Sequence, residues 1–218
     1  MHKVQFTKTM LKGMAGFDLQ VKSGNASIQE FLDAMNEFVE KAALPRLWPP
    51  NCSNCYGCNL CCHEPLPVTS IDVENICRAL QIDFIESFKY LWVQVQGNVV
   101  DITLKRKKGH NCIFLNQEGI CKIYSARPFL CQSFICSNVP ESLNEIRSQI
   151  VNQGMDELVR KAIMAFKSRG KAIPVNLGST RYVNLNDWPR NCFSDKKSYS
   201  KILLKNVLSS DLMRVLLL

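Results

Sequence analysis

Residues 55–62 read CYGCNLCC, inside the longer stretch CSNCYGCNLCCHEP at 52–65. Five cysteines fall within this stretch: Cys52, Cys55, Cys58, Cys61 and Cys62. The whole chain has 11 cysteines in 218 residues, too few for a disulfide scaffold and too many for an average cytosolic protein. A run this dense indicates a disulfide knot, a redox pair or a metal site, and the surrounding fold has to accommodate it.

The rest of the composition favours the metal and redox interpretations. The N-terminal sequence MHKVQFTKTMLKGMAGFDLQ has no apolar run long enough for a signal peptide. No stretch approaches the roughly 18 apolar residues of a membrane span. We therefore expect a cytoplasmic protein without a membrane span, in which cysteines stay reduced.

A formal net charge of +8 raises the possibility of a nucleic-acid partner. A site with four thiolates offsets part of that charge, by about −2 for Zn(II) or an oxidised 4Fe–4S cluster. The basic residues are scattered, apart from short runs such as LKRKKGH at 104–110. We interpret these runs as solvated surface and disfavour nucleic-acid binding.

The spacing of the first cysteines suits a metal, because a C-x2-C step in a tight turn lets two thiolates converge. Gly57 and Asn59 favour such turns. The run lacks the fourth cysteine of a bacterial ferredoxin pattern, C-x2-C-x2-C-x3-C-P. A complete site must therefore take ligands from farther along the chain.

The second half of the chain offers four further candidate ligands: Cys112, Cys121, Cys131 and Cys136. Cys112 and Cys121 bracket a predicted hairpin that would bring both thiols to one end. Cys131 and Cys136 are five apart and cannot share a helix face, so the helix ends between them or they serve different places. Any one of the four could be a small buried hydrophobe, but four together with the first run indicate metal binding. Cys77 continues the apolar stripe of a helix and is predicted to be a core thiol.

Local patterns predict the remaining elements. The expected helices are 25–43, capped by Asn25 or Ser27; 68–80, capped by Thr69 or Ser70; 83 to about 92; 141–169; and 196–217 with a break near 209–210. The expected hairpins are 93–104, turning on Gly97-Asn98, and 112–124, with Gly119 in the turn. A short helix follows Pro128.

These elements predict an α+β fold. Its centre would be small, irregular and organised by a metal, with two β-hairpins, and mostly helical N- and C-terminal segments would surround it. We expect an N-terminal helical segment at 1–47, a cysteine-cluster domain at 48–139 and a C-terminal helical segment at 140–218.

The order of motifs resembles the YkgJ-type cysteine-cluster family, also called CxxCxxCC and described as zinc- or iron-chelating. Its pattern is C-x2-C-x2-C-C, then T-x2-D, then C-x-F-L, then C-x-I-Y-x2-R-P-x2-C. The matching positions are Cys55, Cys58, Cys61 and Cys62; Thr69 and Asp72; Cys112, Phe114 and Leu115; and Cys121, Ile123, Tyr124, Arg127, Pro128 and Cys131. The resemblance spans about 55–135. The chain departs from it at Gln132, where the family commonly has arginine, and at Asn59-Leu60.

The resemblance also allows an enzymatic function, because the family includes a flagellin lysine N-methylase. A Rossmann-type methyltransferase normally shows a glycine-rich loop between a strand and a helix, and the ten glycines here form no such cluster. We favour a chain that has only the cysteine-cluster module. No catalytic residue is identified, and enzymatic activity stays an open question.

Zinc and iron–sulfur clusters both accept four thiolates, so the ligand count does not choose between them. Structural zinc typically uses two C-x2-C knuckles, often with histidine. Here three closely spaced cysteines and one distant one are favoured, which is typical of a 4Fe–4S cluster. Cys61 and Cys62 are adjacent and cannot easily point at one metal ion, so we expect one of them to be a ligand of the main site and the other to have a different use. The thiols suffice for two four-thiolate metal sites, although a single site is favoured. His63 is expected at the surface, and Arg127 is expected to hydrogen-bond backbone carbonyls or neutralise a negative cluster.

The sequence therefore predicts a metal-binding protein with Cys55, Cys58, Cys61, Cys62, Cys112, Cys121, Cys131 and Cys136 as candidate ligands. The favoured cofactor is an iron–sulfur cluster with a structural, electron-transfer or sensing role. The alternatives are a zinc-stabilised interaction module and an S-adenosylmethionine-dependent protein lysine methyltransferase. A protein or redox partner is implied but not identified.

Overall fold

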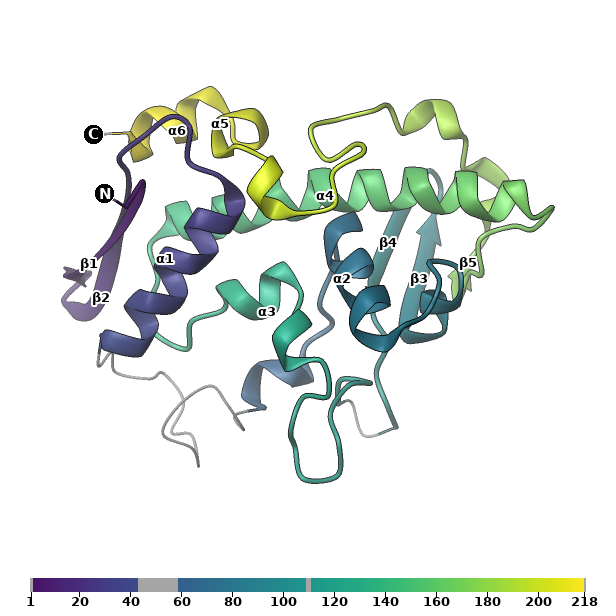
Figure 1. The fold of residues 1–218 in the computed structure, drawn as a ribbon, viewed down its shortest axis with the longest axis horizontal. Coiled ribbons are helices and arrows are strands. Elements are labelled where there is room, and N and C mark those ends of the chain that lie inside the picture. The colour runs from purple at the N-terminus through teal and green to yellow at the C-terminus, as the bar shows by residue number, and fades with distance from the viewer. Residues whose placement is uncertain (1, 43–58, 109–110, 218) are drawn as a thin grey trace. The chain divides into compact units, whose positions relative to one another are not determined.

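The computed structural model describes residues 2–42, 59–108 and 111–217 of the α+β chain (Figure 1). The chain forms two compact units, each built from separate stretches of sequence. The terminal unit comprises 1–58, 132–150 and 196–218, and the cysteine unit comprises 59–131 and 151–195. The predicted division at 47/48 and 139/140 stays a prediction. No helix of the described residues has both the length and the apolar character needed to cross a membrane.

The terminal unit begins with a β-hairpin, in which β1 (Val4–Leu11) pairs antiparallel with β2 (Met14–Val21). The two turn residues, Lys12 and Gly13, have φ of 50° and 79°, which is the left-handed backbone of a two-residue hairpin turn. Alternate residues of β2 are buried. The prediction that 1–47 is helical is therefore wrong for this stretch.

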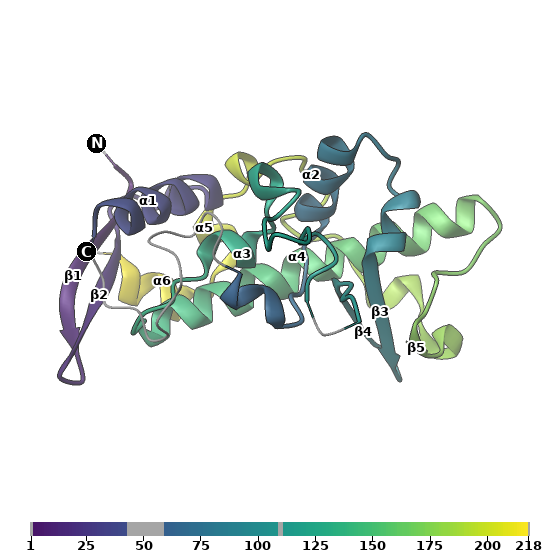
Figure 2. The same cartoon turned by 90° about the horizontal axis from the view of Figure 1, so that it is seen from below.

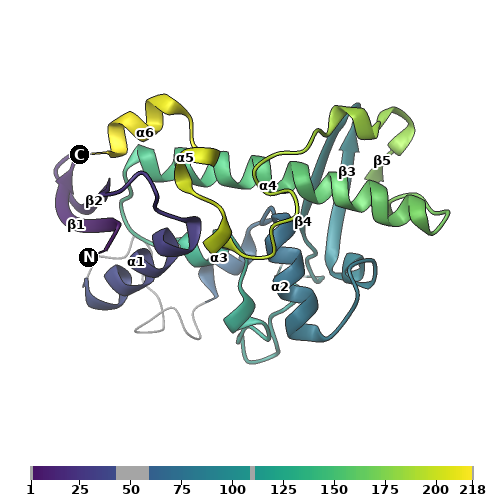
Figure 3. The same ribbon diagram turned by 45° about the horizontal axis from the view of Figure 1, so that its top comes forward.

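Helix α1 (Ile28–Lys41) packs against this hairpin (Figure 3). Its start is a capping box, since the Ser27 amide donates to the Glu30 carboxylate at 2.8 Å and the Glu30 amide donates to the Ser27 hydroxyl at 3.2 Å. Phe31 meets Phe6 of β1, with ring centroids 5.8 Å apart. The predicted helix at 25–43, with Ser27 as its cap, is confirmed.

The last part of the chain completes the terminal unit. Helices α5 (Leu204–Val207) and α6 (Ser210–Leu216) are separated by a break at 208–209, close to the predicted one. The predicted helix over 196–217 is wrong for 196–203, where only the 3-10 helix η6 (Tyr199–Lys201) forms. Ser209 caps α6 by accepting from the Leu212 amide. Leu217 then forms a parallel bridge with Val21 of β2, so α6 docks on the N-terminal hairpin.

The cysteine unit contains a three-stranded sheet of order β4-β3-β5 (Figure 2). The strands are β3 (Leu91–Gln96), β4 (Val99–Leu104) and β5 (Leu177–Gly178). The predicted hairpin at 93–104 is confirmed, with Gly97 at φ 63° in its turn. The predicted helix from 83 to about 92 is wrong. Only the 3-10 helix η2 (Glu86–Tyr90) forms there, because Leu91 already enters the sheet.

Helices cover this sheet. Helix α2 (Ser70–Leu80) begins at the predicted cap Thr69, and α4 (Glu141–Ser168) confirms the predicted long helix. The α4 residues from 151 onward belong to the cysteine unit. There Leu158 and Ala162 join Val93 and Ile102 of the sheet in one apolar core.

The second predicted hairpin, at 112–124, does not form a ladder. Its described backbone has one antiparallel bridge, between Leu115 and Cys121. The Asn116 side chain accepts from the amides of Glu118 and Ile120, at 3.0 and 2.8 Å. This side chain satisfies backbone donors that would otherwise pair across strands, so the segment is a closed loop.

The remaining elements are short. They are η1 (Leu60–His63), η3 (Tyr124–Ala126), α3 (Phe129–Ser133), η4 (Thr180–Tyr182), η5 (Leu185–Asp187) and η6 (Tyr199–Lys201).

Candidate metal centre

Five of the predicted ligands lie in the cysteine unit. Cys61 and Cys62 are on η1, Cys112 and Cys121 are at the two ends of the closed loop, and Cys131 is on α3. Cys136 follows the end of α3, as its spacing from Cys131 predicted, and belongs to the terminal unit. Cys55 and Cys58 lie outside the described residues.

The backbone joins η1 directly to the closed loop. The Cys62 amide donates to the Asn59 carbonyl at 2.9 Å, and the Cys62 carbonyl accepts from the Cys112 amide at 3.0 Å. These bonds fix two adjacent thiols of the first motif beside the first thiol of the second motif.

Gly119 provides a second link between η1 and the loop. Its φ of 78° is in the left-handed region. A β-carbon at this position would lie 2.8 Å from Nδ2 of Asn59. Glycine is required here both for the turn and for the close approach of Asn59.

Asp72 places the third motif. Its carboxylate is fully buried and accepts from the Thr69 amide at 2.9 Å, as part of the capping box of α2. The other oxygen accepts from the Phe129 amide at 2.8 Å. Phe129 is the first residue of α3, so this one carboxylate ties the start of α2 to the helix that carries Cys131.

The five thiols interact electrostatically. A hydrogen bond from the Cys62 thiol, together with the charge of Arg127, lowers the pKa of Cys61 to about 7. The same hydrogen bond raises the pKa of Cys62. The two adjacent thiols therefore share one proton more readily than they lose two.

The other three thiols have raised pKa values, with burial as the main cause. Charge on Cys61 raises the pKa of Cys112, Cys121 and Cys131 further. Buried thiols gathered without a cation stay protonated, and a bound metal ion would reverse this preference.

Thiol donors of this kind fit a thiophilic metal such as zinc or iron, and they do not suit Mg²⁺ or Ca²⁺. Within 2–42, 59–108 and 111–217, however, no three His, Cys, Asp or Glu side chains are close enough together to hold one metal ion. The thiols of the cysteine unit influence one another's pKa but do not by themselves form a ligand set within the described residues. The predicted ligands that would complete it, Cys55 and Cys58, are among the residues outside the description.

Arg127 lies beside the thiols, as expected. Its Nε donates to the Tyr124 carbonyl at 3.1 Å, and its guanidinium stacks on the Tyr124 ring at 3.9 Å. Its positive charge lowers the pKa of Cys61 and partly offsets the raised pKa of Cys121. It therefore stabilises thiolates at this position.

Sequence reasoning missed the role of the basic run at 104–110. Arg106 donates to the His63 carbonyl, and Nζ of Lys107 donates to the Leu115 carbonyl. The charge of Lys107 also opposes the rise in the pKa of Cys112. Lys107 is exposed, as the interpretation of this run as solvated surface predicts, and Arg106 is half-buried, but both side chains also hold backbone carbonyls. The available signal was their position a few residues before Cys112.

Two predictions about residues near the cysteine motifs are confirmed. His63 is exposed. Cys77 is buried in the apolar core of the cysteine unit, with its sulfur 3.6 Å from the Asp83 carbonyl oxygen.

Residues 54–154 match the model of the family CxxCxxCC, whose description is "Putative zinc- or iron-chelating domain". The match confirms the resemblance seen in the motifs and supports metal binding by the cysteine cluster. It covers all eight predicted ligands. No curated protein and no solved structure matches the chain.

Proposed function

We propose that the protein holds one thiolate-ligated iron–sulfur cluster of the 4Fe–4S type. The observation that carries the proposal is the convergence of five thiols from η1, the closed loop and α3 in one unit. Cys61 and Cys131 are the described ligands that we favour, and Cys55 and Cys58 complete the set that the sequence predicts. Such a cluster needs thiolate ligands, and the positive charge of Arg127 beside them would offset part of its negative charge.

Cys61 is a better candidate ligand than its neighbour. Cys62 packs against the apolar core of the cysteine unit, and its backbone is engaged with Cys112. The negative charge of the Cys61 thiolate raises the pKa of all four other thiols. Cys62 would then serve as a core contact that orients η1.

The primary role that we propose for the cluster is to organise the fold around it. The segment that carries Cys112 and Cys121 has little regular secondary structure, and its backbone hydrogen bonds are those of turns and single bridges. A metal centre that joins three such segments contributes directly to folding free energy. An electron-transfer or sensing role would be added to this one.

The test is anaerobic purification followed by a visible spectrum and measurement of iron, zinc and acid-labile sulfide. The proposal predicts broad thiolate-to-iron absorption with iron and sulfide in equal amounts. Cys131→Ser should lose most of both. Cys192→Ser is the matched control, since Cys192 is half-buried and lies outside the family motif.

A colourless protein with stoichiometric zinc would contradict the iron–sulfur assignment and favour the zinc-stabilised module. Four thiolates suit zinc equally well, and the family description names both metals. The lysine methyltransferase alternative stays a prediction. Saturable S-adenosylmethionine binding by the metal-loaded protein would support it.

A further inference from the structure

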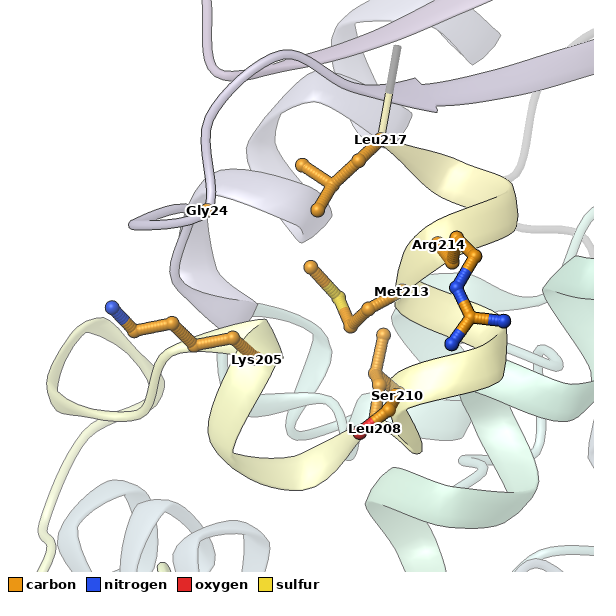
Figure 4. A pocket seen from close by; sticks show the side chains of 7 residues that line it. All are labelled: Gly24, Lys205, Leu208, Ser210, Met213, Arg214 and Leu217. Carbon is orange, nitrogen blue, oxygen red and sulfur yellow. The ribbon is translucent and has the colours of Figure 1, made fainter.

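A pocket of about 440 Å³ lies within the terminal unit, beside the loop at Gly24 and helices α5 and α6 (Figure 4). It is lined by Gly24, Lys205, Leu208, Ser210, Met213, Arg214 and Leu217. None of these residues belongs to the cysteine motifs or to the metal centre.

One wall of the pocket is apolar. Met213 and Leu217 are four residues apart and project from the same side of the chain toward Gly24 (Figure 4). Leu217 is 40% exposed, although its backbone is held by the bridge to Val21. Met213 beside it is buried, so Leu217 supplies most of the apolar surface that this wall presents to water, and that surface favours an apolar ligand.

The charged side chains of the rim are cationic. Nζ of Lys205 donates to the neutral Asn25 side chain at 2.8 Å, so its charge is not offset by a carboxylate in that contact. Arg214 pairs with Asp211 at 3.4 Å, and both of these side chains are mostly exposed. No acidic residue is among those that line the pocket. The polar end of a ligand at Lys205 is therefore expected to be an anion.

The pocket is open at Gly24 because that residue has no side chain. The φ of Gly24 is outside the left-handed region, and a β-carbon there would meet no atom within 4 Å. The backbone thus does not require glycine, and a larger side chain would extend into free space.

We propose that this pocket binds a single-chain anionic amphiphile, namely an aliphatic carboxylate of medium length. The aliphatic chain lies against Met213 and Leu217, and the carboxylate pairs with Lys205. This combination of an apolar body and one fixed polar contact is the usual chemistry of a small-molecule site.

The experiment uses decanoate as the probe, below its micelle concentration, and follows the methionine ε-methyl signals of the full-length protein by NMR. Met213→Leu assigns the Met213 signal. The proposal predicts a saturable shift of that signal, whereas Met164, which is exposed on α4 in the cysteine unit, stays unchanged. Absence of a saturable shift would overturn the proposal.

Charge is tested with two comparisons. 1-Decanol should bind about tenfold more weakly than decanoate, and Lys205→Met should lower the affinity for decanoate by a similar factor. Lys201→Met is the control, because Lys201 is an exposed lysine of the same unit that does not line the pocket. Equal affinity for decanoate and decanol would overturn the assignment to an anionic ligand.

Shape is tested at Gly24. Gly24→Phe should abolish the decanoate-induced shift by filling the pocket, and Gly24→Ala should leave most of it. Decanoate affinity that is unchanged in Gly24→Phe would show that the ligand binds elsewhere and overturn the proposal. The Lys205→Met comparison keeps the test decisive if the phenylalanine variant does not fold.

Discussion

Asp72 illustrates how one buried side chain connects two motifs that are far apart in sequence. Its carboxylate accepts hydrogen bonds from the backbone amides of Thr69 and Phe129, and Phe129 lies 57 residues after Asp72 in the sequence. A buried carboxylate with two such donors contributes to the cap of α2 and to the placement of α3. The T-x2-D motif thereby fixes the helix that carries Cys131.

We predict that Asp72→Asn destabilises the cysteine unit. The amide can accept with one oxygen only, and its NH2 group would face a backbone N–H, so the loss is about 1–3 kcal/mol. Urea unfolding measures this loss, and metal content should fall in parallel. Asp101→Asn, at an exposed position on β4, is the control and should change the unfolding free energy little. An equal effect of both variants would contradict the role given to Asp72.

Gly119 allows a similarly sharp test. Gly119→Ala must adopt φ near 78° and place a β-carbon 2.8 Å from the Asn59 amide. We predict a loss of roughly 1–2 kcal/mol and weaker metal retention, measured by unfolding and by competition with a chelator. Gly97→Ala is the matched control, because Gly97 also has positive φ but its β-carbon would meet nothing. The excess effect at Gly119 isolates the contact with Asn59.

The packing of α4 on α2 depends on Gly154, in the middle of the long helix. A β-carbon there would lie 2.5 Å from Cβ of Thr69 and 3.0 Å from the Phe193 ring. Thr69 is fully buried and caps α2, so it cannot move without breaking the capping box. The glycine therefore allows α4 to lie close to the N-cap of α2.

For Gly154→Ala, two effects oppose each other. Alanine favours the helix by about 1 kcal/mol, whereas overpacking of a rigid contact costs roughly 1–3 kcal/mol. We predict net destabilisation in thermal unfolding. Thr69→Ser retains the capping hydroxyl and removes the methyl group, so it should recover part of the loss in the double variant. A stabilising effect of Gly154→Ala alone would show that the helices separate at little cost.

The elements with complete local signals are those that the sequence predicts well. Helices α1 and α2 have capping residues and apolar stripes within their own boundaries, and the hairpin at 93–104 has its turn residues. The N-terminal hairpin is missed although F-D-L-Q-V at 17–21 alternates apolar and polar residues and Gly13 follows Lys12 in the turn. Its first strand, β1, exposes most of its side chains and gives a weaker pattern. The second hairpin is limited to one bridge, because the Asn116 side chain takes the amides of Glu118 and Ile120 at the turn.

The candidate site is predictable in its residues but not in its assembly. The motif spacing identifies the thiols, and no local pattern predicts that Asp72 reaches Phe129 or that Lys107 reaches Leu115. Such contacts depend on the packing of distant segments. For the same reason, the assignment of Cys136 to the terminal unit could not be inferred from its place in the sequence.

The division into two units predicts a local response to metal removal. Chelation should reduce hydrogen-exchange protection in 111–131, where turns and single bridges rather than a strand ladder hold the chain, and leave the pairing of β1 with β2 largely intact. Hydrogen-exchange mass spectrometry before and after chelation measures both regions in one sample. Uniform loss of protection across the chain would contradict the proposal that the metal organises the cysteine unit.

Metal binding should also depend on pH. Burial raises the pKa of Cys112, Cys121 and Cys131, so these thiols are protonated in the metal-free protein at neutral pH. Each one that becomes a ligand releases a proton, and apparent affinity should fall as pH falls, by roughly tenfold per pH unit for each proton released. Zn(II) titration with measured proton release gives the number of such ligands. Cys192→Ser should leave this number unchanged.

The interrupted chain path of the two units has a consequence for biosynthesis. Every predicted cysteine ligand, through Cys136, emerges from the ribosome before 151–195 and 196–218, which complete the cysteine unit and the terminal unit. The nascent chain therefore exposes reactive thiols to oxidants while neither unit can close. Early delivery of the metal, or protection by a chaperone, would set the yield of active protein in the cell.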